Sequence, residues 1–109
     1  MLETLFGSKN RERVLQFILA NGEGYAKEIA DFYNSSLDPI QKQLEKMELA
    51  GILVSKKVGR TRLFMFNPRY AFLNELKALL EKARTYYSLE EIERLTMRRK
   101  RPRREGKPL

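Results

Sequence analysis

Residues 36–53 read SLDPIQKQLEKMELAGIL, and this run predicts a helix, its end and the start of a strand. Ile40, Leu44 and Met47 recur at spacings of four and three residues, which places them on one buried face of a helix. Gly51 suits the position just after a helix C-terminus, because glycine adopts the left-handed conformation at no steric cost. We therefore expect a helix that ends next to this glycine and β-structure that follows it.

The beginning of this helix has two interpretations. Either Ser36 is the N-cap and Pro39 is tolerated in the first turn, or Asp38 is the N-cap. In the second case Pro39 takes the first helical position and Gln41 completes a capping box. In both cases the face opposite the apolar residues is polar and carries Asp38, Gln41, Lys42, Glu45 and Lys46.

Two helices precede this run. Ser8 suits the N-cap of a helix that extends to about Asn21, and residues 21–24 (NGEG) then break the chain. A short second helix is expected from about Ala26 to Tyr33, because its apolar residues have the spacing of a single buried face. Asn34 follows in the next turn, and asparagine enters the left-handed region more easily than most residues.

Two β-rich runs follow the helix. Residues 52–57 and 62–66 are joined by residues 58–61, which contain a glycine, and this is the pattern of a hairpin. Asn67-Pro68 ends the second run. The hairpin carries four basic residues and no acidic residue, a charge of +4. We call these residues the hairpin cations; they are Lys56, Lys57, Arg60 and Arg62.

An amphipathic helix is predicted next, from about Tyr70 to Tyr87. Its first apolar row repeats at alternating spacings of three and four residues, as in a coiled coil, and consists of Leu73, Leu76, Leu80, Ala83 and Tyr87. A second apolar row repeats every seven residues and consists of Phe72, Leu79 and Tyr86. Ser88 begins a capping box, so we expect a break there and a fifth helix that extends to about Arg99.

The order of these elements is that of a winged helix-turn-helix. Residues 36–53 resemble the recognition helix and the following strand of ArsR/MarR-type bacterial and archaeal regulators. Residues 5–8 (LFGS) at the first helix and Asn67-Pro68 after the hairpin also fit this superfamily, and the resemblance covers about residues 5–85. It implies a transcription regulator that binds double-stranded DNA.

The expected fold class is mainly α with a small β-hairpin (α+β). We expect a winged helix-turn-helix domain over residues 1–69, a C-terminal helical extension over residues 70–97 and a disordered basic tail over residues 98–109. In the superfamily that the chain resembles, the helix after the wing commonly supplies the dimer contact. The first apolar row is therefore the expected dimer interface of a homodimer, although it can instead pack only on its own domain.

The polar face of the helix at about residues 36–50 is the expected recognition surface. A helix fits the major groove of DNA, and the exposed N-terminal half can reach base edges. We expect base contacts from Ser36, Gln41 and Lys42, and backbone contacts from Lys46 and the hairpin cations. Residues 38–48 have a net charge of −1, so most of the attraction for phosphate is expected from the wing, residues 54–66.

The composition excludes several kinds of site. The chain has no cysteine and no histidine, which removes disulfides, zinc sites built on these residues and nucleophilic chemistry by either. ArsR members that sense metals bind them through cysteine and histidine, so metal sensing of that kind is also excluded. We expect no metal, no cofactor and no enzymatic activity, because no acid, base and nucleophile are brought together.

The positive charge is concentrated at one end of the chain. The net charge is +8, and residues 98–109 contribute +6 through seven basic residues and one acidic residue. Such a tail increases affinity for any nucleic acid without adding sequence preference. No apolar run approaches the ~20 residues that cross a bilayer, and the first residues do not form a secretory signal, so a cytoplasmic location is expected.

Two other functions remain open at this point. A winged-helix protein-interaction adaptor is favoured by the net negative charge of residues 38–48. An RNA-binding accessory protein would use the basic tail. The expected partners are double-stranded DNA and a second copy of the chain, and the sequence identifies no effector.

Overall fold

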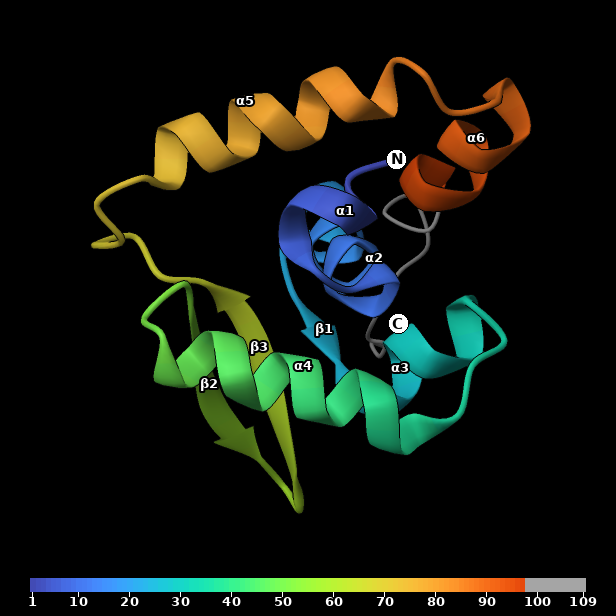
Figure 1. The fold of residues 1–109 in the computed structure, drawn as a ribbon. Coiled ribbons are helices and arrows are strands. Elements are labelled where there is room, and N and C mark those ends of the chain that lie inside the picture. The colour runs from blue at the N-terminus through green and yellow to red at the C-terminus, as the bar shows by residue number, and fades with distance from the viewer. Residues whose placement is uncertain (98–109) are drawn as a thin grey trace.

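The computed structural model describes residues 1–97, and the basic tail with the predicted end of the fifth helix lies outside them. Its α-helices and β-strands are, in chain order, α1 (Glu3–Phe6), α2 (Lys9–Asn21), β1 (Gly24–Tyr25), α3 (Ala26–Phe32), α4 (Leu37–Leu49), β2 (Leu53–Val58), β3 (Thr61–Phe66), α5 (Leu73–Arg84) and α6 (Leu89–Met97). Figure 1 shows α2 in the middle of the molecule, with α5 and α6 on one side and α3, α4 and the sheet on the other.

Helix α2 is the centre of the core. The Arg11 backbone N–H donates to the Ser8 hydroxyl over 3.2 Å, so the predicted N-cap is confirmed. Val14, Phe17 and Ile18 are completely buried, because α2 contacts α4, α5, α6 and the sheet. Because α2 has neighbours on every side, its apolar residues are not confined to one narrow face.

The turn between α3 and α4 has the conformation that the sequence predicts. Asn34 has a φ of 53°, in the left-handed region. Ser36 is the N-cap residue of α4 and Pro39 lies in the first turn, which confirms the first of the two interpretations. The alternative capping box does not form, because Asp38 lies inside the helix and not at its N-cap. Gly51, with a φ of 84°, follows α4 as expected.

The sheet has three antiparallel strands in the order β1-β3-β2. The β2–β3 hairpin is confirmed, with Val58 paired to Thr61 at its tip. Strand β1 was not expected, since a strand of two residues is too short to show a periodic pattern. Gly24 leaves little room for a side chain, because a Cβ atom at this position would lie 3.0 Å from the Phe17 ring and 3.1 Å from the Ile29 side chain.

The C-terminal helices complete the core of the first 69 residues. The Glu91 N–H donates to the Ser88 hydroxyl, and the Ser88 N–H donates to the Glu91 carboxylate, so the predicted capping box and the break before α6 are confirmed. Helix α6 then turns back onto α2 and buries Leu95, which is 3% exposed. Helix α5 is shorter than predicted at both ends, because turns occupy residues 70–72 and 85–87.

The first apolar row faces its own domain. Leu80 is 0% exposed and Ala83 is 3% exposed, while Leu76 and Tyr87 pack against the same core. The Gln16 side-chain amide also donates to the Leu80 carbonyl over 2.8 Å, which attaches α5 to α2. The assignment of Leu80 and Ala83 to a dimer interface is therefore corrected, because a buried side chain has no surface left for a partner. Periodicity shows only that a face is apolar, not what it packs against.

The second apolar row lies beside the first: Phe72 precedes α5, Leu79 lies within it and Tyr86 follows its end. Phe72 is 63% exposed and Tyr86 is 64% exposed, and Leu79 is half-buried. Phe72 and Tyr86 therefore expose two large aromatic side chains close to the two ends of α5.

Glu12 connects α2 to the turn between α5 and α6. Its carboxylate is nearly buried and accepts hydrogen bonds from the Leu2 N–H, from the chain's terminal amine and from the Tyr87 hydroxyl. Burial by itself raises the pKa of Glu12, but these hydrogen bonds outweigh it and the pKa lies below its usual value. Glu12 therefore contributes stability that is present above the ordinary carboxyl pKa and is lost as the pH falls through the lowered pKa.

Substitution of Tyr87 by phenylalanine tests this connection. At pH 7 we expect Tyr87→Phe to lower the free energy of unfolding by about 1.5–3 kcal/mol, the usual contribution of a hydrogen bond to a charged group. At pH 3 the difference from the parent protein should shrink, because protonation of Glu12 weakens the Tyr87 hydrogen bond that only the parent protein has. Urea unfolding at the two pH values measures this, with Tyr86→Phe as the matched control. An equal loss at both pH values would contradict the assignment.

Candidate nucleic-acid interface

Burial of one face of α4 determines which residues the other face presents. Ile40 and Leu44 are 0% exposed and Met47 is 2% exposed, so α4 is locked against α2 and α3. The residues of this helix that are predicted to contact DNA are all exposed. Base contacts are predicted from Ser36, Gln41 and Lys42, and a backbone contact is predicted from Lys46. The structure therefore brings these four residues together on one outer surface.

Two of the side chains predicted to contact bases, Lys42 and Gln41, form weak contacts within α4. The Lys42 ammonium lies 3.2 Å from the Asp38 carboxylate, and the Gln41 amide donates to the Glu45 carboxylate over 3.3 Å. Both are pairs of residues four apart on an exposed helix face, which contribute only about 0.2–0.5 kcal/mol each. Lys42 and Gln41 can therefore exchange these partners for groups on a ligand at small cost.

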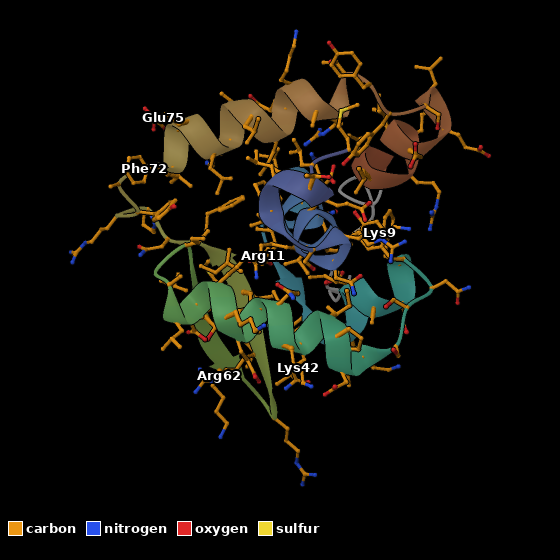
Figure 2. All side chains as sticks on the ribbon, viewed as in Figure 1. Lys9, Arg11, Lys42, Arg62, Phe72 and Glu75 are labelled. Carbon is orange, nitrogen blue, oxygen red and sulfur yellow. The ribbon has the colours of Figure 1, made fainter. Side chains whose placement is uncertain are left out.

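Two of the hairpin cations, Lys57 and Arg62, lie on the same face of the hairpin as Ser55, which contacts α4, whereas Lys56 lies on the other face. All four are exposed, and Lys57 lies directly opposite Arg62 in the β2–β3 pairing. Like charges in directly opposite positions repel one another, so this arrangement is unfavourable unless an anion lies between them. Figure 2 shows Arg62 and Lys42 on the side of the molecule that faces away from α5.

A hydrogen-bonded chain holds the hairpin against the end of α4. The Ser55 hydroxyl donates to the Glu48 carboxylate over 2.7 Å, and the Arg62 guanidinium donates to the Ser55 hydroxyl over 3.3 Å. Sequence reasoning missed Glu48 and Ser55, because their contact depends on the register of the hairpin and on how α4 crosses it. These two hydrogen bonds set the position of Arg62 relative to α4.

Within residues 1–97, no group of three or more acidic side chains is arranged to hold a metal ion, and the sequence has no cysteine or histidine. In the same part of the chain, the helices are all too short or too polar to span a bilayer.

Comparison with known proteins assigns the fold. HlyU from Vibrio cholerae N16961, in its reduced form, superposes with a TM-score of 0.59 at 17% identity, over 79% of this chain and 84% of HlyU. A doubly substituted variant of Lactococcus lactis ZitR, in its apo form, gives a TM-score of 0.55 at 18% identity, over 88% and 81% of the two chains. AdcR, the adhesin competence repressor of Streptococcus pyogenes, gives 0.51 at 14% identity, over 84% and 78%.

These three proteins are winged-helix regulators, HlyU of the ArsR/SmtB family and ZitR and AdcR of the MarR family, and none is an enzyme. At these identities the likeness shows the fold, and the fold is a winged helix-turn-helix. No family model matches the sequence, and neither does any curated protein. In this fold α3 and α4 are the helix-turn-helix pair, and β2 and β3 are the wing.

Proposed function

We propose that this protein is a transcription regulator that binds double-stranded DNA at specific sequences. The observation that supports it best is the exposed polar face of α4 next to a hairpin that carries four exposed cations, in a winged helix-turn-helix fold. In helix-turn-helix proteins the second helix of the pair enters the major groove, and here that helix is α4.

Each exposed residue has a distinct role in this proposal. Ser36, Gln41 and Lys42 contact base edges, since they lie on the exposed N-terminal half of α4. Lys46 and the hairpin cations contact phosphates or the adjacent minor groove, where they supply affinity without sequence preference. The contact between Arg62 and Ser55 keeps the wing at a set distance from the recognition helix.

We propose further that two copies act together. A single recognition helix reaches too few base pairs to select a site in a genome, whereas a two-fold dimer reads an inverted repeat. The surface that we propose for the dimer contact is the second apolar row, together with Leu89, which is 78% exposed. Of the residues first assigned to the interface, Leu73 is only partly buried and can contribute at its edge.

The proposal is tested by selecting duplex DNA from a random pool and measuring affinity for the selected and for scrambled sequences by fluorescence anisotropy. Gln41→Ala and Lys42→Ala should each weaken binding to the selected duplex by about 1–3 kcal/mol and leave scrambled duplex nearly unaffected. Equal weakening on both duplexes would show that these residues read no sequence. Tighter binding to single-stranded RNA than to any duplex, or no binding to nucleic acid, would refute the proposal.

The acidic residues of α4 should limit affinity. Asp38→Asn together with Glu45→Gln releases Lys42 and Gln41 and removes two negative charges that face the DNA. We expect the double variant to bind all duplexes about tenfold more tightly at 0.1 M salt, which corresponds to one added phosphate contact. Anisotropy measures the change, and Glu75→Gln with Glu81→Gln on α5 is the matched control. If the affinity of the double variant is unchanged, the outer face of α4 does not lie against the DNA.

A further inference from the structure

Helix α4 carries two exposed leucines that do not belong to the core. Leu37, the first residue of the helix, is 44% exposed, and Leu49, the last residue, is 90% exposed. The two side chains lie at opposite ends of α4, so they have different surroundings in any complex. Of the two, Leu37 lies at the end of the helix that enters the major groove in the proposed complex with DNA.

The exposure of Leu37 contrasts with its place in the apolar pattern of α4. Ile40 follows it after three residues, Leu44 after four more and Met47 after three more, and all three are buried. Leu37 therefore continues the spacing of a buried helix face. The fold covers this face from Ile40 onward and leaves Leu37 open to solvent, so the core does not account for a large apolar side chain at this position.

The neighbours of Leu37 on α4 are polar side chains that can bind a ligand. Ser36 precedes it, and the Ser36 hydroxyl does not cap the helix. Gln41 lies one helical turn further along the same side, and its side chain forms only the weak contact with Glu45 over 3.3 Å. Side chains four residues apart on a helix have their Cβ atoms about 5–6 Å apart. Leu37 is thus an exposed apolar group next to two of the side chains proposed to contact bases.

The major groove offers one group that matches an apolar side chain. Guanine presents N7 and O6, adenine presents N7 and N6, and cytosine presents N4, whereas thymine presents O4 together with a 5-methyl group. A leucine against a polar base edge removes water without replacing its hydrogen bonds, which is unfavourable. Contact with the methyl group instead buries apolar surface on both molecules. A leucine at this position therefore favours thymine over the other bases.

We propose that Leu37 is a specificity-determining residue that contacts the 5-methyl group of a thymine. This inference rests on the proposed function and adds to it a base that α4 selects. Base pairs stack about 3.4 Å apart, so the 5–6 Å between Leu37 and Gln41 spans one to two base steps. The Gln41 amide suits the N6 and N7 edge of adenine. One A·T pair, or two neighbouring A·T pairs, satisfies both residues.

Replacement of single thymines by uracil in the selected duplex tests this contact, because uracil lacks only the methyl group. Fluorescence anisotropy measures the affinity of the parent protein for duplexes that carry one uracil at each thymine position in turn. At a thymine that Leu37 contacts, we expect uracil to weaken binding about fourfold, which corresponds to the loss of one buried methyl group.

Two variants assign this effect to Leu37. In Leu37→Ala the same uracil should cause almost no further loss, because two changes to a single contact are not additive. Leu49→Ala is the matched control, since it removes the same atoms from the other end of the same helix, and it should keep the full effect of uracil. Both variants should melt close to the parent protein, because both leucines are exposed.

The possible failures of this test differ from failure of the proposed function. A selected site without thymine, or parent binding that no uracil weakens, would overturn the inference while specific duplex binding stands. An equal effect of uracil in Leu37→Ala and in the parent protein would overturn it as well, because another residue would then contact the methyl group. If no duplex is selected at all, the proposed function fails together with the inference.

Discussion

Replacement of all four hairpin cations by glutamine should lower the affinity for duplex DNA about four-thousandfold at 0.1 M salt. Each phosphate contact releases about 0.9 of a counterion, so at this salt concentration each one contributes roughly a factor of eight. The dependence of log affinity on log salt should become flatter by about 3–4 units. The loss should be similar on specific and scrambled sequences, because phosphates carry no sequence information.

Anisotropy at four or more salt concentrations measures both the affinity and the slope. The control removes four exposed or half-exposed cations elsewhere, namely Lys27, Arg69, Lys77 and Lys82. It changes the net charge by the same amount but should alter affinity by less than about threefold, because salt screens charges that do not touch the DNA. The hairpin variant should keep its thermal melt, since the replaced side chains are exposed. Equal losses in both variants would show that only total charge matters and that the wing makes no contact.

The second large effect is expected at Leu80. Leu80→Glu places a carboxylate without a partner at a completely buried position between α5 and α2. The loss of apolar burial and the burial of a charge together cost about 4–5 kcal/mol or more, a large part of the 5–15 kcal/mol that stabilises a typical domain. We expect the melting temperature to fall by roughly 20 °C or more, or the chain to be unfolded at 25 °C.

Phe72→Glu together with Tyr86→Glu, at the two ends of α5, is the matched comparison. Both residues are exposed, so this variant should remain folded and should become monomeric at tens of micromolar, where the parent protein is expected to be a dimer. Circular dichroism melts and light scattering distinguish the two outcomes. If the Leu80→Glu protein is folded and monomeric, the first apolar row is the dimer interface, as the sequence first predicted. A parent protein that is monomeric at these concentrations would refute the proposed dimer.

The predictions that the structure confirms concern residues close together in the chain. The caps at Ser8 and Ser88 and the left-handed residues Asn34 and Gly51 all depend on hydrogen bonds or backbone angles within a few residues. The outward face of α4 was also predictable, because burial of Ile40, Leu44 and Met47 determines where the rest of a helix points. Contact of that face with DNA stays a prediction.

By itself, the sequence determined the order of the main helices, several of their ends, the β2–β3 hairpin and the residues that α4 presents to solvent. Only the tertiary structure decided that the first apolar row packs on α2. It also decided that Tyr87 bonds to Glu12, 75 residues away, and that Arg94 bonds to Phe32, 62 residues away. Local patterns specify an element and its apolar face, because the interactions lie within one or two turns. The partner of that face depends on helix crossing angles and strand register, which many weak contacts across the whole core determine together.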